Sequence, residues 1–326
     1  MYKWLHFKCK GVYEMSKKTM GIHHITAIVG HPQENVDFYA GVLGLRLVKQ
    51  TVNFDDPETY HLYFGNEGGK PGTIITFFPW PGAQQGMIGG GQVGVTSYVV
   101  PKGALEFWEK RLEKFNVSYT KMERFGEQYL EFDDPHGLHL EIVEREEGEV
   151  NTWMFGGVTP DVAIKGFGGA TLLSTQPNKT AELLERVMGL EFVGKEGDFA
   201  RYRSTADIGN VIDLKLTSMG RGEMGVGTVH HIAWRAIDDQ DQLDWKKHVK
   251  ANGYGVTPVK DRNYFNAIYF REHGEILFEI ATDLPGFAHD ESVETMGEKL
   301  MLPEHYEQQR SQIERKLLPL KVRELD

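Results

Sequence analysis

The sequence predicts an α+β fold of four tandem modules, each formed by a strand, a helix and three further strands. Two internal repeats lead to this prediction. The segment at 42–48 reads VLGLRLV and recurs as VMGLEFV at 187–193, each time after a helical pattern. The segment at 132–142 reads FDDPHGLHLEI and recurs, with small gaps, as FREHGEILFEI at 270–280. Repeats of this length indicate copies of one supersecondary unit that cannot bury its apolar face alone.

Apolar residues with a period of two or of 3.6 place the elements of each module. The first module is expected at 21–80, with strands at 22–29, 46–52, 60–64 and 73–78 and a helix at 35–42. The second has strands at 93–100, 129–132 and 138–143 and a helix at 104–115. The third spans 166–216, and the fourth spans 229–281 with a helix at 241–252. We expect the modules to pair into incomplete β-barrels with their helices outside.

The modules divide the chain into two halves. The expected N-terminal half is 20–148, a linker rich in polar residues and glycine covers 149–165, and the C-terminal half is 166–284. Residues 285–326 are charged and are expected to form a helical tail. Residues 1–19 lack the apolar core of a secretory signal, and we expect translation to start naturally at Met15, so that this extension is not native.

Composition excludes several classes of function. The 326 residues include 36 Lys and Arg against 47 Asp and Glu, a net charge of −11. The chain therefore lacks the excess of positive charge that attracts nucleic acid or anionic lipid. The single cysteine, Cys9, excludes an intramolecular disulfide and an iron–sulfur cluster and fits a cytoplasmic location. We therefore expect no nucleic-acid or membrane partner, and a homo-oligomer is left open. Any bound metal must be held by carboxylates and by some of the 13 histidines.

Two strands repeat a His-His-Ile sequence at the same point of the first and last modules. Because neighbouring side chains in a strand point to opposite faces, the apolar set marks the helix-covered face. That set includes Ile25 in the first strand and takes His23 with it, so His24 faces the barrel interior. The same alternation turns His231 inward, away from the face of Ile232 and Trp234.

A carboxylate is expected on the same interior. Glu279 alternates with apolar neighbours on the last strand, and a buried carboxylate costs several kcal/mol unless a cation or hydrogen bonds compensate it. Two imidazoles and one carboxylate form the ligand set of non-haem Fe(II) oxygenases. The alternative, buried polar residues satisfied by hydrogen bonds, stays open for each histidine alone. The middle modules carry Thr96 and Thr171 instead of His, and Glu141 matches Glu279 without a His partner, so one metal site is expected.

The order of elements resembles the vicinal-oxygen-chelate superfamily, whose βαβββ modules pair around a metal. A narrower resemblance, to the hydroquinone 1,2-dioxygenase type of ring-cleaving dioxygenases, extends along nearly the whole chain. It rests on short matches that occur in order: IHHIT at 22–26, YHLYF at 60–64, PGT at 71–73, VPKG at 100–103, RFG at 124–126, VHH at 229–231, DRNYF at 261–265 and FE at 278–279.

This resemblance implies an Fe(II)-dependent enzyme that inserts both atoms of O2 into a hydroquinone-type or catechol-type ring. The iron ligands it implies are His24, His231 and Glu279, with Mn(II) or Zn(II) able to replace iron in purified or crystallised protein. Arg262 would stabilise negative charge on oxygen, and Tyr269 would donate a hydrogen bond to the bound substrate. Proton transfer would fall to His23, His61 or His230, among which the sequence does not choose.

Two rival functions remain. A glyoxalase-type metal-dependent lyase or isomerase usually needs a second inward carboxylate as its base, and the last strand of the first module, TIITFF at 73–78, has none. A non-enzymatic protein that binds small aromatic compounds or antibiotics would not need the three ligands, which are all present.

Overall fold

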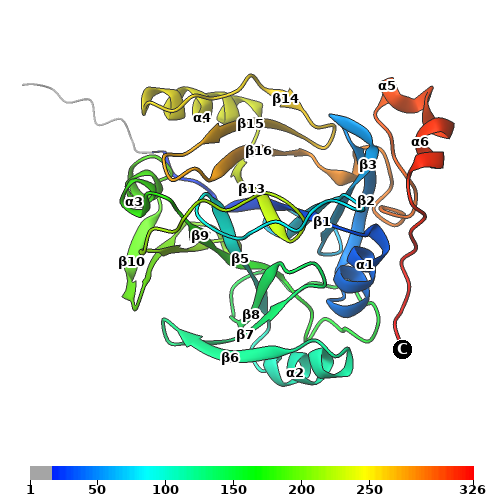
Figure 1. The fold of residues 1–326 in the computed structure, drawn as a ribbon, viewed down its shortest axis with the longest axis horizontal. Coiled ribbons are helices and arrows are strands. Elements are labelled where there is room, and N and C mark those ends of the chain that lie inside the picture. The colour runs from blue at the N-terminus through cyan, green and yellow to red at the C-terminus, as the bar shows by residue number, and fades with distance from the viewer. Residues whose placement is uncertain (1–16) are drawn as a thin grey trace, which may run out of the picture.

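The computed structural model describes residues 17–326, so the start expected at Met15 lies outside the described part. Its strands form two eight-stranded sheets (Figure 1). The first contains, in spatial order, β14 (Lys260–Asp261), β15 (Phe265–Arg271), β16 (Leu277–Pro285), β13 (Thr228–Ala236), β1 (Ile22–Val29), β4 (Ile74–Pro79), β3 (Asp56–Gly65) and β2 (Arg46–Asn53). The second contains β10 (Glu191–Glu196), β11 (Phe199–Arg203), β12 (Val211–Lys215), β9 (Gly166–Leu173), β5 (Gln92–Val100), β8 (His139–Glu144), β7 (Glu127–Asp133) and β6 (Tyr119–Arg124).

Each sheet joins two modules, and those of the first sheet come from opposite ends of the chain. The first module pairs with the fourth through antiparallel β1 and β13, and the second pairs with the third through antiparallel β5 and β9. The predicted α+β fold of paired βαβββ modules is therefore confirmed. The first sheet brings the two ends of the chain together, which is the arrangement that a site shared by His24 and Glu279 requires.

Each module's helix covers the outer face of its sheet. The helices are α2 (Leu105–Lys114), α3 (Pro177–Arg186), α4 (Asp239–Ala251) and, in the first module, a short α1 (Pro32–Val36) that continues as the π-helical turn η1 (Asp37–Val42). They bury Trp108, Leu184, Trp245 and Tyr39 against the sheets. The sequence predicted one helix at 35–42 in the first module, whereas the structure begins it at Pro32 and widens its second half into a π-turn.

The FDDPHG and FREHG repeats are turns that hold one module onto another. Asp134 accepts hydrogen bonds from the backbone N–H groups of His136 and Leu138 and from the hydroxyl of Tyr39 in the first module. Glu272 likewise accepts bonds from backbone N–H groups of its own turn and from the hydroxyl of Thr180 in the third. These carboxylates thus connect modules that lie in different sheets.

The chain after β16 wraps the outside of the first sheet (Figure 1). It contains the 3-10 turn η2 (Phe287–His289), α5 (Glu304–Glu307) and α6 (Arg310–Lys316). Ile313 and Leu317 pack on Val52, and Lys49, which is fully buried, pairs with Asp290 and Glu291 at 2.5 Å each. The tail therefore covers the β2 side of the first sheet. Among residues 17–326, no helix is both long and apolar enough to cross a membrane.

Candidate metal centre

Two β-bulges carry the repeated histidine pairs of the first sheet. Between Ile22 and His24 the strand β1 has one residue more than β13 opposite it, and the extra residue is His23. Between His231 and Val229 the strand β13 has one more than β1, and the extra residue is His230. A bulge leaves its extra residue unpaired and re-aims the neighbouring side chains, a device common beside active sites.

The bulges overturn the predicted orientation of the first histidine of each pair. Strict alternation placed His23 beneath the helix, but its ring lies 5.4 Å from the ring of Phe265, on the side occupied by His24. His230 was expected to face away from His231, but both line the same cavity. The prediction failed because an inserted residue breaks the period of two on which it depended.

The second histidine of each pair meets Glu279 in a compact cluster. The ligand atoms of His24, His231 and Glu279 all lie within 4.8 Å of one another. His231 Nε2 is 2.8 Å and His24 Nε2 is 3.5 Å from Glu279 Oε2, and the two Nε2 atoms are 3.3 Å apart. All three side chains are buried. In the part of the chain that the structure describes, this is the one cluster of three or more such groups placed to hold a metal ion.

Protonation states in the cluster suit metal binding. Burial lowers the pKa of His231, which favours the neutral imidazole. Burial by itself would raise the pKa of Glu279, but the attraction of the His24 and His231 rings in their protonated form outweighs it and holds this pKa well below its usual range, so the carboxylate ionises before the imidazoles lose their protons. A carboxylate and a neutral imidazole are the forms that coordinate metals.

His23 and His230 fix which nitrogen of each ligand faces the cluster. His23 Nε2 lies 3.1 Å from the carbonyl oxygen of Thr282, which can only accept, so this nitrogen carries the proton. His23 Nδ1 therefore accepts from His24 Nδ1 at 2.9 Å, which leaves the lone pair of His24 on Nε2. His230 Nδ1 is 2.7 Å from His231 Nδ1, so this bond also turns the Nε2 atom of the ligand toward the cluster. Partners of this kind orient metal-binding imidazoles.

A divalent cation fits this donor set. Neither oxygen of Glu279 has a hydrogen-bond partner of normal geometry, although both are buried, and a buried carboxylate without compensation is costly. Two imidazole nitrogens and one carboxylate suit iron, manganese or zinc, and sulfur ligands are absent from the cluster. Three protein ligands leave coordination positions for other molecules.

The cluster forms one end of a cavity of about 460 Å³. Tyr269 lies directly opposite Glu279 in the pairing of β15 with β16, and its ring is 5.8 Å from that of His231. The side chain of Arg262 donates from Nε to the Tyr269 hydroxyl at 3.3 Å. The structure therefore brings these two predicted pocket residues to the cluster.

His61 lines the same cavity from the first module. Its Nδ1 is 2.8 Å from the Tyr63 hydroxyl and its Nε2 is 2.7 Å from the Thr76 hydroxyl, which in turn is 3.0 Å from that of Thr26. Tyr63 pairs with Thr76 as Tyr269 pairs with Glu279, so Thr76 occupies the position that corresponds to Glu279 in the first module. No second carboxylate stands there.

The remaining cavity walls were not singled out from the sequence. They include an aromatic shelf, in which the rings of Phe78 and Trp80 are stacked 6.2 Å apart at 15°. Alternation along β4 could have found Phe78, since it lies two residues after Thr76 on the same face. Phe265, whose ring is 4.9 Å from that of His24, gave no such signal because its strand pairs irregularly there.

The first sheet curves around the cluster of His24, His231 and Glu279, and we call this hollow the first cup. The second sheet forms a corresponding second cup, lined by Arg124, Glu141 and Asp213 among others, which holds no such cluster in the described residues. Counted from its own bulges at Gly94 and Gly168, Val95 and Gly169 take the positions of His24 and His231. Strict alternation predicts Thr96 and Thr171 at those positions, and this prediction is wrong because a bulge shifts the period of two. A Cβ on Gly169 would lie 2.2 Å from the carbonyl oxygen of Val211, so no histidine fits.

Comparisons with known proteins agree with the fold. Residues 21–142 and 166–280 match the family described as the Glyoxalase/Bleomycin resistance protein/Dioxygenase superfamily. The chain is 84% identical over 312 residues to the Bacillus subtilis (strain 168) protein named "Putative ring-cleaving dioxygenase MhqO", covering 96% of this chain and 100% of the relative. It is 36% identical over 297 residues to the chlorohydroquinone/hydroquinone 1,2-dioxygenase of Sphingobium indicum, covering 88% of this chain and 92% of that protein.

A solved structure is similar over the same extent. The crystal structure of a "putative dioxygenase" from Bacillus subtilis subsp. subtilis str. 168 superposes with a TM-score of 0.94 at 84% identity, covering 95% of this chain and 100% of that chain. The resemblance found from the short motifs is confirmed by these matches. The chain belongs to the Glyoxalase/Bleomycin resistance protein/Dioxygenase superfamily.

Proposed function

We propose that this protein is an Fe(II)-dependent ring-cleaving dioxygenase that acts on a hydroquinone-type or catechol-type aromatic and inserts both atoms of O2. The observation that carries the proposal is the compact cluster of His24, His231 and Glu279 at the end of an aromatic-walled cavity. The names of two similar proteins, a ring-cleaving dioxygenase and a hydroquinone 1,2-dioxygenase, point to the same reaction. A bound Fe(II) would supply a redox-active centre with open positions for a phenolate oxygen and for O2.

Arg262 and Tyr269 are placed to hold the oxygen of the substrate. Burial raises the pKa of Tyr269 above its usual range, so its hydroxyl keeps its proton and can donate a hydrogen bond. The Arg262 guanidinium is mostly buried at 18% side-chain exposure, and a charge there acts more strongly than it would in water. Together they favour a ring oxygen that gains negative charge at the metal end of the cavity.

His61 is assigned to move a proton, and His23 and His230 to position the ligands. Burial lowers the pKa of His61 well below its usual value, so the imidazole is neutral at neutral pH and can accept a proton. Its two nitrogens meet the hydroxyl groups of Tyr63, which also lines the cavity, and of Thr76, which continues the hydrogen-bonded chain to Thr26. His23 and His230 are instead committed to the Nδ1 atoms of His24 and His231.

The two rival functions account for fewer features. A glyoxalase-type lyase or isomerase lacks its usual second carboxylate, because Thr76 stands at that position and is held by His61 and Thr26. A protein that only binds aromatic compounds gives no reason for a buried carboxylate to lie beside two imidazoles, with no hydrogen bond of normal geometry from residues 17–326 and with each ring held by a second histidine.

Oxygen consumption by protein loaded anaerobically with Fe(II) tests the proposal. We expect O2 uptake with at least one member of a panel of hydroquinones and catechols, and a ring-opened product that carries both atoms of isotopically labelled O2. His231→Ala should abolish uptake, and Lys250→Gln, a change on the exposed outer face of α4, should not. An iron-loaded protein that consumes no O2 with the whole panel would contradict the proposal.

A further inference from the structure

The cavity is too large for an unsubstituted ring. A bare hydroquinone has eight non-hydrogen atoms, and even at the ~30 Å³ that a liquid water molecule takes up, these fill less than about 240 Å³. The cavity measures about 460 Å³. About half of it is therefore left for a ring substituent, for O2 and for water.

The walls of the cavity change in character from its floor to its mouth. The three metal-ligating residues and Phe265 at the floor are buried, whereas Phe54, Trp80 and Leu277 are partly exposed and apolar. Beyond them the rim carries charged side chains from two modules. A substituent that extends from a ring at the floor would first pass apolar side chains and then reach these charges.

The charges at the rim are mainly positive. Lys260 is exposed and makes no ion pair with any residue in the range 17–326. Arg262 contributes a second cation through its terminal nitrogens, which pair at 3.3 Å with Asp55, a carboxylate that is 69% exposed on the turn between β2 and β3, whereas its Nε edge faces Tyr269 and the ring oxygen. The chain as a whole carries a net charge of −11, so a cationic mouth is a local exception to its acidic surface. Such a mouth attracts anions.

We propose that the natural substrate is a hydroquinone with a short arm that ends in an anionic group, which Lys260 and Arg262 bind at the rim. This inference rests on the proposed ring-cleaving function and adds the chemistry of the ring substituent. In the proposed complex the apolar part of the arm lies along Phe54 and the Phe78–Trp80 shelf. The anionic end competes with Asp55 for Arg262 and meets Lys260, whose charge no side chain in the described chain neutralises.

A matched pair of compounds tests the charge of the arm. A hydroquinone with a propanoate arm and the corresponding amide have nearly the same shape and differ by one charge. We expect kcat/KM for the propanoate to exceed that for the amide by about two- to fivefold, the size of effect typical of partly exposed ion pairs. The preference should shrink in high salt, because screening shortens the reach of exposed charges.

Three variants assign the preference to the rim. Lys260→Gln should reduce kcat/KM for the propanoate while leaving the amide and unsubstituted hydroquinone unchanged, and Asp55→Asn should increase the preference because it frees Arg262. Lys250→Gln, which removes the same charge from the outer face of α4, should have no effect. Anaerobic binding of the two compounds, followed through the fluorescence of tryptophan, which includes Trp80 of the shelf, gives a readout that does not depend on turnover.

The outcomes separate this inference from the proposed function. If no hydroquinone or catechol in the panel leads to O2 consumption, the ring-cleaving function is wrong, and anaerobic binding still reports whether the rim prefers the anionic arm. If unsubstituted hydroquinone is cleaved but the propanoate and amide bind and react equally, the inference about the arm is overturned and the function stands. Equal losses for both compounds in Lys260→Gln would also overturn it.

Discussion

The two cups of this protein place a buried carboxylate at the same point of the strand pairing and treat it in opposite ways. In the first sheet Glu279 faces two imidazoles and, among residues 17–326, has no hydrogen-bond partner of normal geometry. In the second sheet the matching carboxylates are Asp213 and Glu141. Arg124 pairs with both of them, at 2.8 and 3.1 Å, and Arg201 pairs with Asp213 at 2.8 Å.

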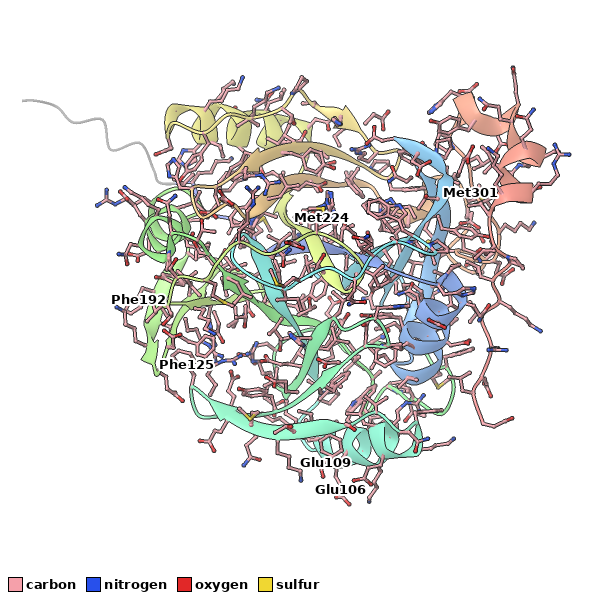
Figure 2. The ribbon with its side chains drawn as sticks, viewed as in Figure 1. Glu106, Glu109, Phe125, Phe192, Met224 and Met301 are labelled. Carbon is pink, nitrogen blue, oxygen red and sulfur yellow. The ribbon has the colours of Figure 1, made fainter. Side chains whose placement is uncertain are left out.

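The second cup is closed by its own charges. Arg145 and Arg201 both pair with Glu127, so three guanidinium groups balance three carboxylates and leave a free volume of only about 20 Å³ between them. Phe125, which Figure 2 shows at the edge of the second sheet, packs its ring 4.3 Å from the Arg201 guanidinium. Arginine keeps its charge at any ordinary pH and satisfies a buried carboxylate permanently, whereas neutral imidazoles leave that task to a metal ion. The same fold thus yields one cup with a donor set that fits a metal ion and one cup closed by ion pairs.

Asp213→Asn gives the largest effect expected from this comparison. It leaves Arg124 and Arg201 buried with too little negative charge, and removing one partner from a buried network costs about 3–5 kcal/mol of unfolding free energy. Urea unfolding of metal-free protein measures the loss. Glu279→Gln, the change at the matching position, should cost much less because no guanidinium depends on Glu279. Equal losses in the two variants would show that the cups do not differ as described.

The gain in stability on adding metal should depend on Glu279 and not on Asp213. The wild-type protein and Asp213→Asn should each gain about 2.7 kcal/mol of stability at a metal concentration 100 times the dissociation constant, as mass action requires of a ligand that binds only the folded state. Mn(II) suits this measurement because it resists oxidation. Glu279→Gln should gain almost nothing, since it has lost one of three ligands. A full gain of stability in Glu279→Gln would show that Glu279 is not a metal ligand.

The two cups also show which features a sequence can reveal. Alternation along strands was enough to turn His24, His231 and Glu279 toward one interior, because each lies on a strand with a clear apolar face. It failed at His23, His230 and the Thr96 and Thr171 positions, since a bulge depends on the partner strand and leaves no mark in the local pattern.

Other features of the second cup escaped prediction for a related reason. The strand β6 was not predicted because nearly all its side chains are exposed, so its sequence carries no apolar alternation. The arginine network joins residues from β6, β11 and the end of β8, and its members become neighbours only through long-range pairing. Neither kind of contact can be read from spacing along the chain.

His23 and His230 test whether the bulges exist to orient the metal ligands. His23→Ala removes the acceptor of His24 Nδ1 and should weaken metal binding by about 10- to 100-fold, the usual effect of losing such a partner. His23→Asn, whose amide oxygen can take the place of Nδ1, should recover part of the loss. Calorimetric titration measures the Mn(II) affinity of both variants. An unchanged Mn(II) affinity in His23→Ala would show that the bulge does not serve to orient His24 for metal binding.

The smallest expected effect concerns acid sensitivity of the second cup. Burial alone would raise the pKa of Glu127, but hydrogen bonds and charges from Arg145 and Arg201 outweigh it and lower this pKa below the usual value of 4.5. An acid whose pKa is lower in the folded state stabilises the protein above its unfolded pKa, and the stabilisation is lost as pH falls through the folded value.

Glu127→Gln should therefore be less stable than the wild type by about 1 kcal/mol at pH 7, a modest figure because part of the side chain reaches water. The difference should persist down to about pH 4.5 and disappear in stronger acid, where the wild-type carboxylate is also neutral. Unfolding curves for both proteins across this range measure it, and a difference that does not change with pH would mean that packing, and not charge, makes Glu127 matter to the closed cup.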